Sequence, residues 1–241
     1  MDWQSLSDWD RQTPGQTLLG LATALLAGKG RVIQHAAKLV CTLVVGKGGS
    51  GKTTFALRYL VSDTDLTCRF IFDPRGDISE RLRIPPAELE PELELALEDR
   101  FVIFDPALMF PGNHQAGLEY FCNWVNLKCQ RMPGRKVLMI DEVWKYCSPN
   151  SLCLPLGVAV LDGRKFGLET MFVAQQPNRL NESILAQVTE LVAFHLQGEN
   201  GLAKFKKLVA VEVPLEEIQS LPMGSYVAVS ESGGVLRGRV F

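Results

Sequence analysis

The stretch that decides the fold is residues 44–54, which read VVGKGGSGKTT. It contains the pattern G-x-x-x-x-G-K-[ST], follows an apolar run and precedes a helical pattern, as phosphate-binding loops (P-loops) do. Glycines allow backbone N–H groups to turn towards a polyphosphate, and the N-terminus of the next helix favours the same anion. The sequence therefore predicts a P-loop with these nucleotide-binding residues: Gly46, Lys47, Gly48, Gly49, Ser50, Gly51, Lys52, Thr53 and Thr54.

Two side chains of the P-loop have distinct expected roles. Lys52 is predicted to reach the β- and γ-phosphates of ATP, and Thr53 is predicted to bind Mg²⁺. ATP and Mg²⁺ are thus the expected cofactors. The alternative is a glycine-rich turn that binds nothing, and the strand and helix patterns on either side argue against it.

Composition limits the class of protein. The chain has 241 residues, of which 46% are hydrophobic and 22% charged, which fits a single large globular core. A net charge of −2 excludes a general basic coat, so any contact with nucleic acid must come from local patches. There is no signal peptide and no C-x-x-C pair, so we expect a cytoplasmic protein, not a secreted one, whose cysteines are reduced and buried: Cys41, Cys68, Cys122, Cys129, Cys147 and Cys153.

The chain is expected to have two parts. Residues 1–37 form an N-terminal extension in which the apolar stretch 17–27 predicts a short helix. Eleven residues are too few to cross a bilayer, so we expect no transmembrane helix, and this helix would pack on the protein, contact another subunit or lie on a membrane surface. Residues 38–241 form the main domain.

The main domain alternates strand and helix patterns. Strands are predicted at 36–45, 68–72, 101–104, 136–140, 171–174 and 190–196, with helices at 50–61 and 119–128. Such alternation predicts an α/β fold with a mostly parallel central sheet that is flanked by helices. At the end of the chain, 224–229 and 235–241 predict a β-hairpin around a glycine turn.

Acidic residues follow two of the predicted strands. The strand 68–72 ends in the turn Asp73-Pro74-Arg75-Gly76-Asp77, and open α/β sheets bind ligands at the carboxyl ends of their strands. The strand 136–140 ends in Asp141-Glu142, which is the Walker B arrangement. In that arrangement Asp141 holds a water of Mg²⁺ and Glu142 polarises the water that attacks the γ-phosphate. An apolar run that ends in an acid is a weak signal alone, and it becomes a strong one after a P-loop.

The order of the motifs resembles a known family. GKGGSGKTT, IFDPRGD, VLMIDE, GRKFGLETMFVAQQPNRL and LPMGSYVAVS follow one another as in the FtsK/HerA superfamily of RecA-like DNA-pumping ATPases. In its short form, with no large extra domain, the chain resembles the genome-packaging ATPases of tailless, internal-membrane double-stranded DNA viruses (tectivirus-like). The resemblance covers residues 38–241, and its most specific parts are residues 163–167 and 173–177.

The resemblance implies a RecA-like fold and a motor that hydrolyses ATP to translocate double-stranded DNA, most specifically into a viral capsid. It implies that Gln175 senses the γ-phosphate and that Arg164 inserts into the site of a neighbouring subunit. The implied partners are double-stranded DNA, further copies in a ring, with a hexamer favoured, and a protein of a capsid vertex or viral membrane. The implied location is the host cytoplasm or the virion.

Three other classes stay open. The first is the class of signature-lysine, partitioning-type ATPases, because Lys47 gives the loop their form K-G-G-x-G-K-T. In that class Lys47 would cross to the partner's phosphates. Those ATPases usually lack the counterparts of Glu142 and of Gly163-Arg164. A conjugation- or morphogenesis-type ATPase is the second alternative. The third is a small-molecule kinase or a nucleotide-binding assembly protein, and Glu142 favours hydrolysis over phosphotransfer.

Three clusters remain as candidate contacts. The basic clusters are Lys128, Arg131, Arg135 and Lys136, and Lys204, Lys206 and Lys207, each of which is either a DNA contact or a solvated face. Residues 144–146, Trp-Lys-Tyr, follow the Walker B acids directly. They are either a loop that couples hydrolysis to motion or packing residues.

Overall fold

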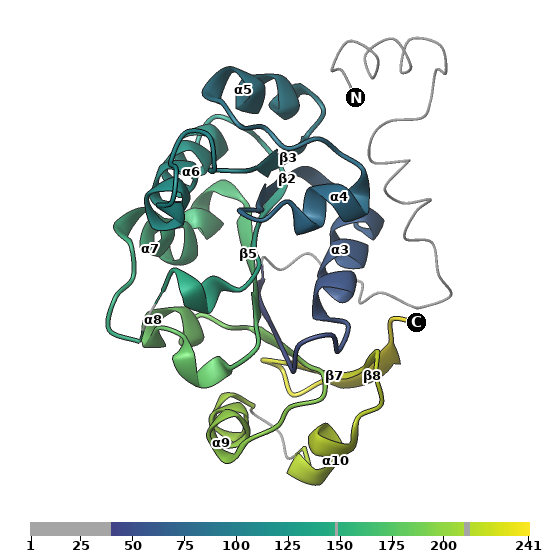
Figure 1. The fold of residues 1–241 in the computed structure, drawn as a ribbon. Coiled ribbons are helices and arrows are strands. Elements are labelled where there is room, and N and C mark those ends of the chain that lie inside the picture. The colour runs from purple at the N-terminus through teal and green to yellow at the C-terminus, as the bar shows by residue number, and fades with distance from the viewer. Residues whose placement is uncertain (1–39, 148, 210–212) are drawn as a thin grey trace.

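The computed structural model describes residues 40–147, 149–209 and 213–241, so the helix expected at 17–27 lies outside the described residues. The described residues form one eight-stranded sheet with helices on both faces (Figure 1). This confirms the predicted α/β fold with its mostly parallel sheet.

The strand order is β3-β2-β4-β5-β1-β6-β7-β8. Strands β1 to β6 pair in parallel, whereas β7 and β8 form the predicted antiparallel hairpin at one edge. The strands are β1 Cys41–Val45, β2 Leu66–Phe72, β3 Phe101–Phe104, β4 Arg135–Ile140, β5 Leu168–Ala174, β6 Glu190–Ala193, β7 Ser225–Ser230 and β8 Val235–Arg239.

Strand β5 lies between β1 and β4, and this insertion positions the site. In register, Val45 of β1 is opposite Ala174 of β5, and Phe172 of β5 is opposite Ile140 of β4. The three parallel strands therefore end at the same edge of the sheet. The P-loop, Asp141 and Gln175 each follow one of these ends directly.

The two faces of the sheet have separate cores, because side chains alternate along buried parallel strands. Val44 and Ile71 pack under α3 and α4, whereas Leu43 and Phe72 face the other helices. The helices are α3 Lys52–Ser62, α4 Asp77–Leu82, α5 Glu90–Glu98, α6 His114–Cys129, α7 Leu154–Leu161, α8 Glu182–Leu185, α9 Glu199–Leu208 and α10 Leu215–Ser220, with 3-10 turns η1 Val143–Lys145, η2 Gly163–Phe166 and η3 Pro177–Arg179.

One expectation about individual residues is confirmed. All six cysteines are buried and free. The acidic segment 85–99 contains the amphipathic helix α5, which buries Leu93 and Ala96 while its glutamates stay near solvent. No helix among the described residues has the length and apolar character needed to span a membrane.

Candidate nucleotide-binding and hydrolysis site

The P-loop has the conformation that its glycines permit. Gly46, Gly49 and Gly51 all have positive φ angles, of 152°, 74° and 110°. A Cβ atom on Gly46 would lie 2.7 Å from the Cβ of Phe194, so no larger residue fits there without displacing the segment directly after β6. Lys47, Gly48 and Gly49 are exposed, and a Cβ on Gly48 or Gly49 would meet no atom within 4 Å. The outer side of the loop is therefore open to a ligand.

Lys52 begins α3 and is 7% exposed. Its Nζ donates a hydrogen bond to the carbonyl oxygen of Lys47 at 2.8 Å, so the ammonium lies inside the curve of the P-loop. Burial lowers the pKa of Lys52, and the nearby charges of Asp141 and Glu142 oppose that effect. The ammonium is thus a partly desolvated cation, which interacts more strongly with an anion than an exposed lysine does.

Thr53 and Asp141 lie in contact, as expected of two groups predicted to share a metal ion. The Thr53 hydroxyl donates to Oδ2 of Asp141 at 3.0 Å, and the backbone N–H of Glu142 donates to Oδ1 at 2.7 Å. Burial raises the pKa of Asp141, while the hydrogen bonds from Thr53 and Glu142 lower it in part. Such oxygen groups are what Mg²⁺ prefers.

The hydroxyl of Ser50 gives a test of whether a nucleotide fits. The atom Oγ is buried, and no described residue shares a hydrogen bond with it. A buried hydroxyl without a partner is costly, so it indicates a group that a ligand satisfies. Together with the open glycine loop, Lys52 and the Thr53–Asp141 pair, it fits a magnesium-bound nucleoside triphosphate.

Glu142 is held by three side chains. Gln175 donates from Nε2 to Oε1 at 3.0 Å, Arg75 Nη2 lies 3.3 Å from the same oxygen, and Lys145 pairs with Oε2. Burial alone would raise the pKa of Glu142, but the hydrogen bond from Lys145 and the charge of Arg75 outweigh it and lower this pKa. The predicted sensor and the predicted base are therefore in direct contact.

Arg75 and Lys145 are the site residues that sequence reasoning missed as partners of Glu142. A usable signal existed for Arg75, because it lies in the turn after β2, at the edge of the sheet where ligands bind. Residues 144–146 were expected to be either a coupling loop or packing residues, and Lys145 lies in η1 shortly after Glu142. Its neighbour Tyr146 packs edge-on against Phe72, with ring centroids 5.3 Å apart.

Arg164 is the one predicted catalytic residue that does not join the others. It lies in η2, before the amino end of β5, and its Nη2 donates to the carbonyl oxygen of Gln187 at 3.0 Å. The P-loop follows the carboxyl end of β1, which is parallel to β5. The seven residues of β5 therefore separate Arg164 from its own P-loop edge by roughly 20 Å.

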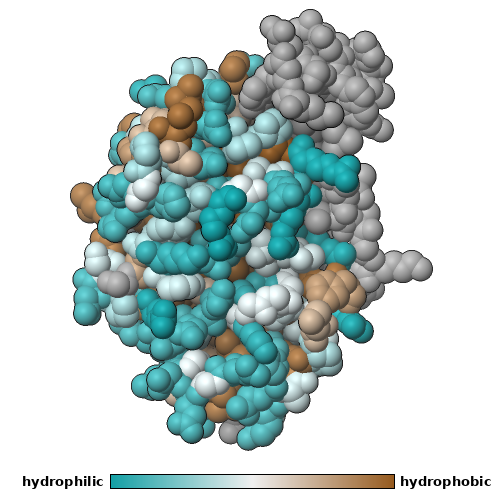
Figure 2. Space-filling model, in the orientation of Figure 1, coloured by the Kyte–Doolittle hydropathy of each residue, from teal (hydrophilic) through white to brown (hydrophobic). Residues whose placement is uncertain are grey.

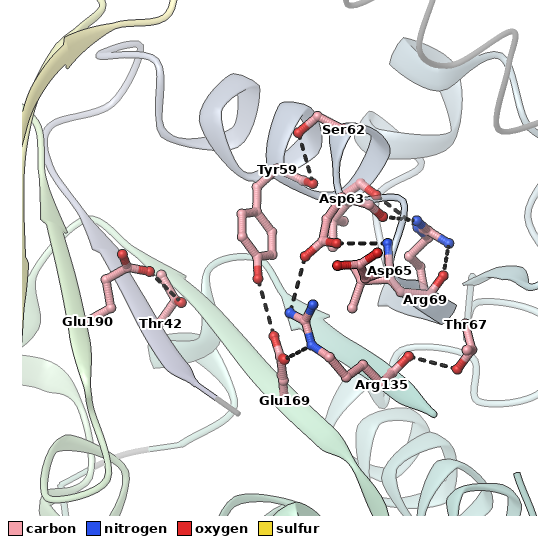
Figure 3. Close-up of polar contacts among 12 residues, drawn as sticks. Thr42, Tyr59, Ser62, Asp63, Asp65, Thr67, Arg69, Arg135, Glu169 and Glu190 are labelled. Atoms are coloured by element: carbon pink, nitrogen blue, oxygen red, sulfur yellow. Dashed lines mark hydrogen bonds and ion pairs between the residues drawn. The ribbon is translucent and has the colours of Figure 1, made fainter. Parts of the chain in front are cut away.

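Two of the four residues in the first basic cluster, Arg135 and Lys136, do not form a DNA surface. Lys136 is fully buried and donates to the carbonyl oxygen of Met132, and Arg135 pairs with Glu169 at 2.7 Å and with Asp63 at 3.1 Å. Both residues begin the buried strand β4, and their side chains are bonded within the protein. They are therefore not available to contact DNA. Figure 3 shows the Arg135 network, in which Glu169 also accepts a hydrogen bond from Tyr59 of α3 at 3.2 Å.

The second basic cluster lies on α9. Lys204 pairs with Glu182, whereas Lys206 and Lys207 are exposed. Their role as a DNA contact or a solvated face stays open.

Comparison with known proteins gives matches at the level of structure. No protein-family model matches the chain, and no curated protein matches its sequence. The DNA-packaging ATPase from Sulfolobus Turreted Icosahedral Virus superposes with a TM-score of 0.68 and 16% identity, over 83% of this chain and 97% of the viral one.

Two further structures show the same likeness. The genome-packaging NTPase of Sulfolobus turreted icosahedral virus 2, in complex with ATP-gammaS, gives a TM-score of 0.67 at 16% identity over 83% of this chain and 96% of that one. VirB4 of Thermoanaerobacter pseudethanolicus gives 0.59 at 11% identity over 83% and 89%. The chain therefore has the fold of the P-loop ATPases, and the expected likeness to viral genome-packaging ATPases is confirmed at the level of that fold.

Proposed function

We propose that this protein hydrolyses ATP and couples the hydrolysis to the movement of double-stranded DNA, most specifically the packaging of a viral genome. The observation that carries the proposal is the convergence of Lys52, Thr53, Asp141, Glu142 and Gln175 at the carboxyl ends of three adjacent parallel strands. A P-loop alone supports nucleotide binding. The added glutamate and glutamine supply the groups that hydrolysis needs.

Each residue has a defined task in this proposal. The P-loop amides and Lys52 would bind the phosphates, and Thr53 and Asp141 would hold Mg²⁺. The metal ion, when bound, neutralises charge on the phosphate oxygens. Glu142 orients the attacking water and accepts its proton, and Gln175, which contacts Glu142 at 3.0 Å, links this carboxylate to the γ-phosphate.

The fold supports the DNA part of the proposal. The similar solved structures include a DNA-packaging ATPase, and the superposition covers 83% of this chain and 97% of that one. A net charge of −2 leaves local patches as the DNA contacts, and the exposed Lys206 and Lys207 of α9 are candidates. A protein at a capsid vertex or in a viral membrane is the proposed further partner.

Two exposed apolar surfaces support a ring. The first, the α7 stripe, consists of Leu154, Val158 and Leu161, which follow one face of α7 and are 79%, 37% and 54% exposed. It ends three residues before Arg164. A stripe of this kind on a soluble protein marks an interaction surface.

The second surface, the loop-side patch, consists of Met223 and Phe241, which are 67% and 55% exposed. It borders the P-loop, because the N–H of Gly224 donates to the carbonyl oxygen of Ser50 at 3.1 Å and a Cβ on Gly224 would lie 2.8 Å from the ring of Phe241. Figure 2 shows apolar surface at the C-terminus of the chain, within an otherwise mostly hydrophilic view.

The two surfaces fit a head-to-tail contact between copies. Helix α7, which carries the stripe, packs on the opposite face of the sheet from α3, which follows the P-loop, so one copy cannot bring the two surfaces together. If the α7 stripe of one copy covers the loop-side patch of the next, Arg164 is carried towards the neighbour's nucleotide. A heterologous contact of this kind forms a ring when the rotation between neighbouring copies closes.

The division of labour between binding and hydrolysis is the test of the site. Glu142→Gln should bind ATP with Mg²⁺ nearly as well as the parent and hydrolyse it poorly, because Asp141 keeps the metal shell while the attacking water loses its base. Lys52→Ala should lose turnover through the loss of phosphate contacts. Equal loss of nucleotide affinity in Glu142→Gln, measured by titration calorimetry on folded protein, would contradict the assignment.

A further inference from the structure

The residues before β7 and after β8 lie at the edge of the sheet that carries the P-loop. Strand β6 is parallel to β1, β7 is antiparallel to β6, and β8 is antiparallel to β7. Strand β7 therefore begins, and β8 ends, at the edge where the P-loop follows β1. This topology brings Met223 and Gly224, which precede β7, and Val240 and Phe241, which follow β8, to the edge of the nucleotide site.

Backbone contacts fix these residues against the P-loop. The N–H of Gly224 donates to the carbonyl oxygen of Ser50 at 3.1 Å, and the N–H of Val240 donates to the carbonyl oxygen of Gly224 at 2.8 Å. A Cβ atom on Gly51 would lie 2.9 Å from Cγ2 of Val240 and 3.4 Å from the Cα of Gly224. The two segments therefore pack directly on the loop that is proposed to bind phosphates.

The loop-side patch, Met223 and Phe241, is the apolar surface of these two segments. The ring of Phe241 lies against the backbone of Gly224, where a Cβ atom would be 2.8 to 3.1 Å from three of the ring carbons. Gly224 has a φ of 80°, and its lack of a side chain leaves room for the ring. Phe241 is still 55% exposed, and Met223 is 67% exposed. An aromatic ring that is fixed on one side and open on the other is suited to stack on a planar group.

The order of the strands sets the direction in which a bound nucleotide extends. Glu142 and Gln175, which are proposed to act at the γ-phosphate, lie beyond the ends of β4 and β5. Those strands lie on one side of β1, whereas β6, β7 and β8 lie on the other. With the γ-phosphate on the β5 side of the P-loop, the ribose and the base extend towards the loop-side patch.

We infer that the loop-side patch binds the base of the nucleotide, which stacks on Phe241 and contacts Met223, and that the substrate is a purine nucleoside triphosphate. The inference rests on the proposed function and names the substrate class of that site. A purine has a larger π-face than a pyrimidine and gains more from stacking, while adenine and guanine present similar faces to the ring. The thioether of Met223 adds a favourable contact with an aromatic base. Adenine and guanine nucleotides should therefore bind with similar affinity.

The test compares the affinities of ADP, GDP, CDP and inorganic pyrophosphate, none of which carries a γ-phosphate to be hydrolysed. Titration calorimetry with Mg²⁺ should give similar affinities for ADP and GDP and a lower one for CDP. Phe241→Ala should weaken the binding of ADP and GDP about tenfold, as expected for the loss of one base–aromatic stack, and leave that of pyrophosphate unchanged. Met223→Ala should have a smaller effect in the same direction, because the base keeps its contact with the ring.

Two further variants separate stacking from a structural role of the ring. Phe241→Trp should keep the affinity for ADP, because indole also stacks, whereas Phe241→Leu, which keeps only an apolar side chain, should lose it. The fluorescence that Phe241→Trp adds to that of the parent should be quenched by ADP and stay constant with pyrophosphate. Leu95→Ala is the matched control, since Leu95 is 58% exposed on α5, and it should keep the affinities of the parent.

Two results would overturn the inference. If Phe241→Ala weakens the binding of ADP and pyrophosphate equally, the patch supports the P-loop and does not contact the base. If it lowers the particle mass and leaves every affinity unchanged, the patch serves only the contact between copies. A parent that binds purine nucleotides as expected but does not hydrolyse ATP, or does so at one rate with and without duplex DNA, contradicts the proposed function and leaves the inference in place.

Discussion

Glu142 combines backbone strain with a dense set of polar contacts. Its φ of 49° and ψ of 40° are left-handed, and for a residue other than glycine such a conformation costs on the order of 1 kcal/mol. The hydrogen bond from Gln175 and the contacts of Arg75 and Lys145 offset this cost. Strain that is maintained by surrounding contacts is typical of functional sites, because it fixes a side chain in one direction.

Arg164 is expected to act on a neighbouring subunit. Arg164→Ala should keep ATP binding and lose turnover by a factor on the order of 10³, because an arginine that reaches a transferring phosphate contributes that much, whereas an exposed arginine contributes almost nothing. When Arg164→Ala is mixed with Lys52→Ala, part of the activity should return, since one variant supplies an intact P-loop and the other an intact arginine. The measurement is the steady-state ATPase rate across mixing ratios.

The control for that experiment is independent proof of subunit exchange, for example by energy transfer between labelled copies. Exchange without any recovery of activity would leave Arg164 acting within its own subunit through its bond to the Gln187 carbonyl. Lys165→Ala is a matched control variant, because Lys165 is the adjacent exposed cation and pairs with Asp162.

At the scale of elements, a buried polar network joins the first helix of the site to two strands of the sheet. Glu169 of β5 is 1% exposed and bonds to Arg135 of β4 and to Tyr59 of α3 (Figure 3). β5 ends directly before Gln175, β4 ends directly before Asp141, and α3 begins at Lys52 of the P-loop. The network therefore fixes, from the opposite edge of the sheet, the three elements that carry the site.

Glu169→Gln should destabilise the protein by about 3 kcal/mol, because breaking one partner of a buried ion pair leaves a charge without full compensation. Tyr59→Phe, which removes only the hydrogen bond, should cost about 1 kcal/mol. The measurement is the midpoint of urea unfolding at neutral pH.

The exposed pair between Lys165 and Asp162 provides the comparison for that prediction. Asp162→Asn should change stability by less than about 1 kcal/mol, since solvent screens a surface pair. If Glu169→Gln proves as mild as Asp162→Asn, the network does not hold these elements together.

The sequence predicted the elements that carry the strongest local signals. The P-loop, α3 and β4 were expected because a fixed glycine spacing, the helical pattern after it and an apolar run that ends in Asp-Glu identify them without tertiary information. The order of the strands was not predictable in this way, since the position of β5 between β1 and β4 depends on how distant segments pair. The contact between Arg75 and Glu142 was not predictable either. These residues are far apart in the chain and meet only because the strands that they follow, β2 and β4, are neighbours in the sheet. Lys136 was misjudged because a lysine at the start of a strand can be buried when a carbonyl oxygen accepts a hydrogen bond from its ammonium group.

At the scale of the whole molecule, the α7 stripe and the loop-side patch should be covered when copies assemble. Leu154→Gln combined with Leu161→Gln should yield smaller particles, because it places polar groups in the contact between copies. Stability of the single chain should stay within about 0.5 kcal/mol, since both leucines are exposed. Particle mass by light scattering in the presence of nucleotide measures the effect.

Leu95→Gln is the matched control for that surface. Leu95 is an equally exposed leucine, 58%, on α5, away from both surfaces. Its variant should assemble as the parent does. A double variant of α7 that retains the full particle mass would show that the α7 stripe faces some other partner.

The measurement that tests the central claim most directly is the ATPase rate of the purified protein, with and without double-stranded DNA, on particles whose mass is determined in the same sample. The account predicts a multimeric ring that turns over ATP, a clear rise in rate on adding duplex DNA, and no turnover in Lys52→Ala under either condition. A monomer or dimer whose ATPase rate is the same with and without DNA would contradict it.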